Sequence, residues 1–279
     1  MTLLRHVEAC NRFDPAEYLD FAISGHAIGR IRHEAAELLL AEKLAAKLPT
    51  GVGISGGGFK AVSARLADIT AALAGAGMMA PLREELTPVL RKWGAGPCAE
   101  IDRAGLPGLG VPAFGVHVNG YVRNGHGLFL WIGHRARDRQ VAPGKLDHLV
   151  AGGIPMGYSA METVIKEAEE EAGIDADLAA RAKPVSTITY RLTTPEGFRN
   201  DTLFVFDLEV PAGTVPVGVD GEVERFELLP VQRVIELLRD TDDFKFNVNL
   251  VLIDFLVRHG LLDPDTEPDY AAVVRGLRH

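Results

Sequence analysis

The segment from residue 149 to residue 173 carries signals for a strand, a loop and a helix in that order. It begins with LVAGG, a short apolar run that ends in two glycines and is typical of a buried strand. Ser159 and Glu162 form an S-x-x-E capping box, and Gly173 stands where a left-handed C-cap is expected. These signals predict a helix over 160–172 directly after a strand, an arrangement typical of an α/β fold.

The predicted helix has one apolar face and one acidic face. At 3.6 residues per turn the apolar positions share an arc of about 100°; they are Met161, Val164, Ile165, Ala168 and Ala172. Glu167, Glu170 and Glu171 share another face, although acids near the C-terminal end of a helix are unfavourable. A solvated acidic face is the ordinary interpretation of such a run. Converging carboxylates fit a second interpretation, a site for Mg²⁺ or Mn²⁺.

Composition and charge exclude several classes of protein. The chain has 279 residues, enough for two domains, and a net charge of −9 from 29 basic and 38 acidic residues. This balance argues against bulk binding to nucleic acid or to an anionic membrane. We expect no membrane span, because the longest apolar runs are too short. Two cysteines without a framework and an N-terminus broken by charges predict a cytoplasmic protein.

The first part of the chain predicts a smaller, mixed and mostly helical N-terminal domain. Helices are expected at 14–23, 32–48 and 63–77, and residues 82–93 are expected to form a helix or a pair of turns. The Gly- and Pro-rich segment 104–115 is the best candidate for a linker. We therefore place an accessory domain at 1–111.

The rest of the chain predicts a sheet with helices around it. Two strand-like runs, 116–122 and 127–133, flank an Asn-Gly turn and predict a hairpin. Further strands are expected at 185–192, 202–210 and 223–229, and helices at 230–239 and 248–259. Strands and helices segregate in this way in an α/β sandwich.

The strand–loop–helix segment resembles the Nudix box, G-x5-E-x7-R-E-U-x-E-E-x-G-U, in which U is a bulky apolar residue. The spacing agrees from Gly152 to Ile174, and the order of strand, loop and helix is the one the motif requires. Two positions depart from it: Tyr158 stands at the first Glu and Lys166 at the Arg. Lys keeps the charge but lacks the planar fork of Arg.

The resemblance implies an α/β/α sandwich of the Nudix type over residues 112–262, with a C-terminal tail at 263–279. It implies an enzyme of the MutT-like class that uses Mg²⁺ or Mn²⁺ to cleave a small-molecule diphosphate. The implied metal ligands are Glu167, Glu170, Glu171 and the carbonyl of Ala151, and the implied motif glycines are Gly152, Gly153 and Gly173. Glu170 and Lys166 are the implied catalytic residues of the helix.

Longer stretches within 114–260 resemble the Nudix branch related to the domain joined to thiamine pyrophosphokinase in fungi. That resemblance implies hydrolysis of thiamine diphosphate, or a damaged form of it, to a monophosphate. The alternative is a catalytically weak module that binds a nucleotide or thiamine diphosphate. Tyr158 favours this alternative, and the three helix glutamates argue against it.

Four residues outside the box are further candidates for the site. Arg135, Arg137 and Lys145 lie in the loop before the glycine-ended strand, where they either bind phosphate oxygens or are solvated loop charges. Glu222 follows a turn and is a candidate for the water-activating base. The alternative is that it only ends a strand; we favour a role as the base or as an outer metal ligand.

Overall fold

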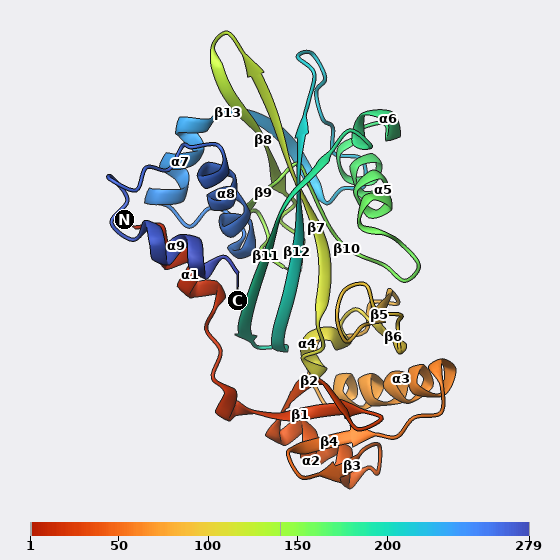
Figure 1. The fold of residues 1–279 in the computed structure, drawn as a ribbon. Helices are drawn as coiled ribbons and strands as arrows, with labels where there is room; N and C mark the ends of the chain where they lie inside the picture. Colours follow the sequence, from red (N-terminus) through yellow and green to blue (C-terminus); the bar gives the residue numbers. More distant parts are fainter. Residues whose placement is uncertain (1, 140, 279) are drawn as a thin grey trace.

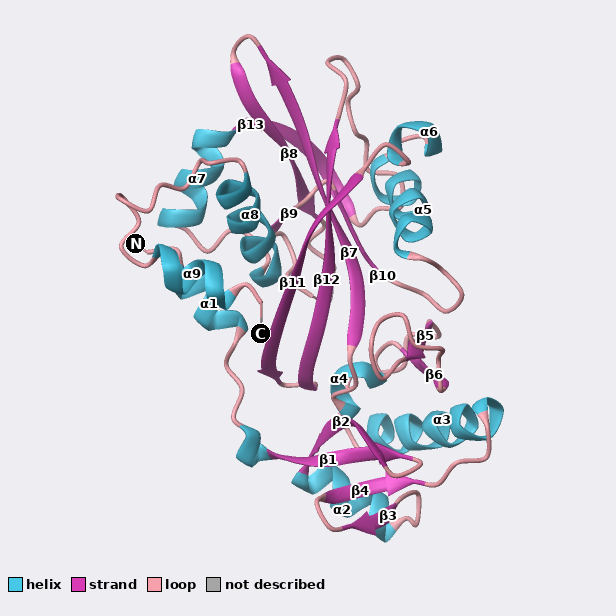
Figure 2. Cartoon of the chain, in the orientation of Figure 1, coloured by secondary structure: helices cyan, strands magenta, loops and turns pink. Residues whose placement is uncertain are grey.

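The structure is a computed structural model that describes residues 2–139 and 141–278. A smaller unit containing β1 to β4 lies at one end of a larger sheet that has helices on both faces (Figures 1 and 2). The elements up to residue 109 are α1 (Leu4–Cys10), η1 (Pro15–Glu17), β1 (Tyr18–Ile23), β2 (His26–Arg32), α2 (His33–Ala41), β3 (Ala46–Leu48), β4 (Gly51–Ile54), α3 (Phe59–Gly75), β5 (Leu86–Val89), β6 (Ala99–Asp102) and α4 (Gly105–Leu109). Those that follow are β7 (Ala113–Asn124), β8 (Gly127–Arg135), β9 (Leu146–Asp147), β10 (Val150–Gly153), α5 (Ala160–Ala172), α6 (Ala176–Ala179), β11 (Lys183–Thr194), β12 (Gly197–Glu209), β13 (Val223–Pro230), α7 (Val231–Asp240), α8 (Phe246–Arg258) and α9 (Tyr270–Gly276).

The smaller unit is mixed, as expected, but a sheet that the sequence did not reveal lies at its centre. The strand order is β2-β1-β4-β3, and β1 occupies residues predicted to be helical. Phe21, Ala22 and Ile23 are all buried, and a strand covered in this way has no alternation to distinguish it from a helix. The helix predicted at 32–48 ends at Ala41, and 82–93 contains β5 instead of a helix.

The larger sheet follows the predicted strands closely. Its strands run in the order β11-β12-β7-β8-β13, with β10 paired to β7 and β9 paired to β8. The β7–β8 hairpin and the three later strands confirm the predicted positions. The β12–β7 pair is parallel, while β7 pairs antiparallel with both β8 and β10. This arrangement puts β10, which ends in Gly152 and Gly153, beside the start of β7.

Helices cover both faces of this sheet, which confirms the predicted α/β/α sandwich. Val116, Val118 and Phe206 face α5 and pack with its buried residues. Leu203 and Val205 face the other way, into a core formed with α7 and α8. The alternation along each strand therefore supplies both cores, and Figure 1 shows α5 and α7 on opposite sides of the sheet.

The two ends of the chain pack together on the α8 side of the sheet. Leu3, Val7 and Cys10 belong to the same buried core as Val273 and Leu277. The helix α1 therefore packs on the larger unit, and α9 packs there as well, although the sequence predicted only a tail. We still propose a domain boundary near residue 111. The smaller domain then begins after α1.

The predicted linker 104–115 is a buried joint. It holds α4 and the start of β7, and Gly105, Leu109 and Val111 are buried. A Cβ on Gly29 of β2 would lie 2.2 Å from the carbonyl oxygen of Leu109, and one on Gly197 of β12 would lie 2.1 Å from that of Pro107. The small sheet and the large sheet thus both contact the α4 backbone directly.

Gly110→Ala should destabilise this joint. Gly110 has a φ of +57°, and an added Cβ would lie 2.4 Å from the carbonyl oxygen of Arg30. Left-handed backbone and steric strain together should lower the free energy of unfolding by on the order of 1–3 kcal/mol in urea titrations. Gly125→Ala is the control, because nothing lies within 4 Å of its added Cβ. Equal effects of the two variants would contradict the tight joint.

Candidate active site

The helix α5 has the predicted bounds and the predicted caps. Ser159 Oγ accepts a hydrogen bond from the Glu162 backbone N–H at 3.2 Å, and the Glu162 carboxylate accepts one from the Ser159 N–H at 2.8 Å. Gly173 ends the helix with a φ of +61°. Val164, Ala168 and Ala172 are buried against the sheet. The caps and the apolar face fix the rotation of α5, and with it the direction of its glutamates.

Gly152 leaves the space that the Glu167 side chain occupies. A Cβ at Gly152 would lie 2.5 Å from Glu167 Cδ and 2.7 Å from its Oε1. The Glu167 side chain is 15% exposed, and burial raises the pKa of its carboxyl even though Lys166 acts in the opposite direction. The glycine therefore brings a largely buried carboxylate onto the β10 backbone.

Glu171 is the most enclosed carboxylate of the helix. It is 8% exposed, and its Oε2 accepts a hydrogen bond from the Ala151 N–H at 3.0 Å. Burial raises the pKa of Glu171 well above its usual range, and the nearby charges of Asp147, Glu167 and Glu222 raise it further. A bound cation would stabilise the charged form of an acid that lies near three other acids.

Glu170 and Lys166 lie on the more open side of the helix. The Glu170 side chain is 50% exposed and forms an ion pair with Lys166 one turn earlier. Lys166 Nζ also lies 3.3 Å from Glu167 Oε1, so the ammonium group contacts two of the three predicted ligands. Hydrogen bonds to both carboxylates raise the pKa of Lys166 against the effect of burial.

The carboxylates have the ligand type and the charge that a divalent cation requires, but their side chains do not converge on one point. Over residues 2–139 and 141–278, no group of three or more His, Cys, Asp or Glu side chains has the spacing of a metal site. Glu167 and Glu171 face β10, whereas Glu170 turns to Lys166. Hard oxygen donors and unrelieved repulsion at Glu171 suit Mg²⁺ or Mn²⁺, and the side chain of Glu170 would have to leave Lys166 to join them.

Glu222, the predicted base, lies close enough to Glu171 to raise its pKa. Its carboxylate forms an ion pair with Arg139 at 2.6 Å and is 31% exposed. Its backbone carbonyl accepts a hydrogen bond from the Ala136 N–H at 2.9 Å, which holds the turn before β13 against the loop after β8.

Arg135 is placed differently from the prediction. Its side chain is buried, with Nη1 2.7 Å from Asp147 Oδ2 and Nη2 donating to the Val141 carbonyl at 3.1 Å. Burial would raise the pKa of Asp147, but Lys245, His148 and Arg135 together hold it below its usual value. Arg135 thus stabilises a buried carboxylate, and we no longer propose it as a phosphate ligand.

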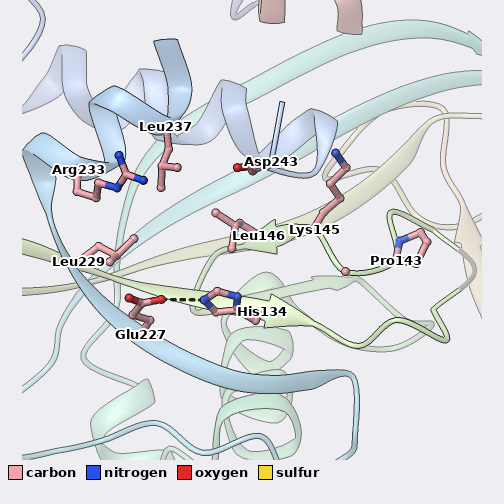
Figure 3. A pocket seen from close by; sticks show the side chains of 10 residues that line it. His134, Pro143, Lys145, Leu146, Glu227, Leu229, Arg233, Leu237 and Asp243 are labelled. Atoms are coloured by element: carbon pink, nitrogen blue, oxygen red, sulfur yellow. Dashed lines mark hydrogen bonds and ion pairs between the residues drawn. The ribbon is translucent and has the colours of Figure 1, made fainter. Parts of the chain in front are cut away.

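Lys145 and Arg137 come from the loop between β8 and β9, and a Cβ at Gly144, the residue before Lys145, would lie 3.6 Å from Arg137 Cγ. Lys145 Nζ donates to the Asp242 carbonyl at 2.7 Å and lines a cavity of about 520 Å³ with His134, Glu227 and Arg233 (Figure 3). That cavity lies on the α7 side of the sheet, since Leu229 and Leu237 also line it. Arg137 is exposed in the loop after β8. Of the three predicted cations, Arg137 alone is exposed.

Arg103 is a neighbour of the site that the sequence did not indicate. It follows β6 in the smaller unit, and its guanidinium atoms lie 3.4 to 3.5 Å from where a Gly153 Cβ would be. It also acts on Glu167, lowering the pKa of that carboxyl. No local pattern marks Arg103, because about 50 residues of chain separate it from the strand it approaches.

Comparison with known proteins identifies the domain that holds this site. The sequence model described as NUDIX domain matches residues 113–249. These residues form a Nudix domain. The match begins at β7 and includes the glycine-ended strand and α5.

Two Arabidopsis thaliana proteins are similar to the chain beyond this domain. Nudix hydrolase 24, chloroplastic, is 44% identical over 214 residues, covering 77% of this chain and 58% of that protein. Nudix hydrolase 20, chloroplastic, is 43% identical over 214 residues, covering 77% of this chain and 57% of that protein. The chain therefore spans little more than half the length of these relatives. A solved structure from Deinococcus radiodurans is 20% identical, with a TM-score of 0.45, and covers 61% of this chain and 98% of that one.

Glu171→Gln should stabilise the metal-free protein at alkaline pH. Folding raises the pKa of Glu171, so the folded state keeps a proton that the unfolded chain releases near pH 4.3. The free energy of unfolding therefore falls as the pH rises above that value, by up to about 1.4 kcal/mol per pH unit. Urea titrations with chelator at pH 5 and pH 8 should show a smaller fall for Glu171→Gln than for the wild type. Equal falls would contradict the buried charge.

Gly152→Ala should weaken cation binding with little loss of stability. The added Cβ would displace the end of a flexible Glu167 side chain and would not strike backbone. The melting temperature without metal should stay close to that of the wild type, while its rise on adding Mn²⁺ should become smaller. Gly153→Ala is the matched control, since its Cβ would meet only ordinary contacts with Arg103 at 3.4 Å or more. A full rise in Gly152→Ala would count against Glu167 as a ligand.

Proposed function

We propose that this chain is a divalent-cation-dependent Nudix hydrolase that cleaves a small organic diphosphate to a monophosphate. The observation that carries the proposal is the pair of enclosed carboxylates, Glu167 and Glu171, set against the β10 backbone in a Nudix domain. Similarity to two proteins named Nudix hydrolases supports it. The proposed ligands are Glu167, Glu170, Glu171 and the carbonyl of Ala151.

A bound cation would supply charge neutralisation on the phosphoryl oxygens. Water forms a bond to one phosphorus while the bridging P–O bond on the opposite side breaks, so the products are an organic monophosphate and phosphate. Glu222, one-third exposed and beside Glu171, is the proposed acceptor of the water proton. Arg139, paired with Glu222, orients that carboxylate for this role. Lys166 orients Glu167 and Glu170 through its two contacts.

Resemblance to the branch joined to thiamine pyrophosphokinase supports thiamine diphosphate, or a damaged form, as the substrate. We also propose a cytoplasmic location, for which the free cysteines Cys10 and Cys98 are the support. Among the described residues no helix has the length and apolarity to cross a bilayer.

A binding module without hydrolysis is the second candidate. Tyr158 stands in place of the first box glutamate and is 45% exposed, and the acidic side chains of the described residues are not gathered into a finished metal cage. Such a module would bind the same diphosphates with metal and release no product.

Glu170→Gln and Tyr158→Phe should separate the two candidates. If the protein is a hydrolase, Glu170→Gln should lower kcat by about 100-fold or more, because it removes a charge that holds the cation. Tyr158→Phe should leave kcat within about twofold, since the hydroxyl sits on an exposed side chain. Phosphate release from a panel of diphosphates with Mg²⁺ or Mn²⁺ measures both. Metal-dependent binding with no product from the wild type would favour the binding module.

A further inference from the structure

Three aromatic rings meet where the smaller unit contacts the Nudix domain. Trp93, in the loop between β5 and β6, packs on Phe204 at 4.6 Å and on Phe114 at 5.2 Å between ring centroids. Phe114 and Phe204 are nearly parallel, with 10° between their planes. Trp93 is 40% exposed, and the two phenylalanines are half-buried. We call these three residues the aromatic platform.

The register of the sheet puts the aromatic platform beside the enclosed glutamates. Phe204 pairs with Val116, and Val116 pairs with Gly152, so the three residues form one row across β12, β7 and β10. Paired residues project to the same face, and adjacent strands lie about 4.8 Å apart. Phe204 is therefore about 10 Å from Gly152, over which the Glu167 carboxylate sits. A ring, a short linker and a diphosphate can bridge this separation.

The hairpin that carries Trp93 also contacts the loop before α5. The Met156 N–H donates to the Leu86 carbonyl of β5 at 3.3 Å. Figure 2 shows β5 and β6 between α3 and the loop that joins β10 to α5. The smaller unit thus contacts the loop before α5 through β5, and it contributes Trp93 to the aromatic platform.

Arg103 places positive charge at the end of β10, beside Gly153. Both oxygens of Glu85 accept hydrogen bonds from its Nη1, at 3.0 and 3.1 Å, while Nε and Nη2 lie beside Gly153. Burial lowers the pKa of Arg83, and the guanidinium groups of Arg103 and Arg199 lower it further. Glu85 and Asp102 act on Arg83 in the opposite direction. The planar fork of Arg103 suits a phosphate group.

We propose that the smaller unit completes the substrate site: the aromatic platform stacks on the planar ring of an organic diphosphate, and Arg103 holds one of its phosphates. This inference rests on the proposed function and names its substrate class, diphosphates whose organic part carries an aromatic or heteroaromatic ring. Trp93 and Arg103 are then specificity residues that reach the Nudix domain from another part of the chain.

Binding of ringed and ringless probes tests the proposal without relying on turnover. Trp93 and Trp131 are the two tryptophans of the chain, and Trp131 is buried, so Trp131→Phe leaves Trp93 as the reporter. With Mg²⁺ present, thiamine diphosphate or ADP should quench its fluorescence in a saturable way, and inorganic pyrophosphate should not. Absence of ring-dependent quenching with both ringed probes would overturn the stacking role.

Kinetics on the full chain tests the same role. Trp93→Ala should raise KM for a ringed diphosphate by roughly tenfold or more, since stacking contributes about 1–3 kcal/mol, and should change kcat by less than about threefold. Trp93→Phe should restore most of the binding. The matched control is Val185→Ala, an apolar residue 37% exposed on β11 at the edge of the sheet, which should leave KM unchanged.

Arg103→Ala should weaken the binding of ringed and ringless probes alike, whereas Trp93→Ala should weaken the binding of the ringed probes only. If the wild type hydrolyses diphosphates but Trp93→Ala keeps the wild-type KM, the inference fails and the proposed function stands. If ringed probes quench Trp93 but no product forms, the hydrolase function fails and the inference stands.

Discussion

The contact of α4 with the two sheets is the interaction on which the arrangement of this protein depends. Gly29 and Gly197 bring backbone from the small and the large sheet to within van der Waals contact of α4 carbonyls. Next to it, Phe13 stacks on Phe198 with 4.2 Å between ring centroids, and Arg32 donates to the Thr194 carbonyl at 2.6 Å. Because backbone atoms of both sheets contact α4, the smaller unit has little freedom to rotate away from the Nudix domain.

The orientation of the smaller unit has a chemical consequence. The β5–β6 hairpin is held beside the strand end that carries Gly153, and Arg103 comes with it. A Nudix domain without this unit would have its glutamates but would lack the guanidinium group next to them. The accessory unit therefore alters the electrostatic potential at the mouth of the site, where the proposed diphosphate would bind.

The surroundings of the α5 glutamates explain why this helix carries acidic residues near its C-terminal end, where they are unfavourable. Glu171 is buried among carboxylates and retains one stabilising hydrogen bond, from the Ala151 N–H. Lys166 offsets part of the charge of Glu167 and Glu170, but it does not reach the enclosed end. The cost in stability is local, and the two caps and the apolar face of α5 offset it.

The order of residues along the chain was enough to define α5, because capping residues and apolar periodicity act within a few turns. The same reasoning missed the strand β1, because a short buried strand shows no alternation of apolar and polar residues. The sequence did not indicate that Arg135 is buried beside Asp147, or that Arg103 approaches the end of β10, for one reason. Asp147 lies on β9 and Gly153 on β10, so each contact joins separate elements of the fold. Charge is readable in a sequence, but whether a charge is paired or free is decided by which elements pack together.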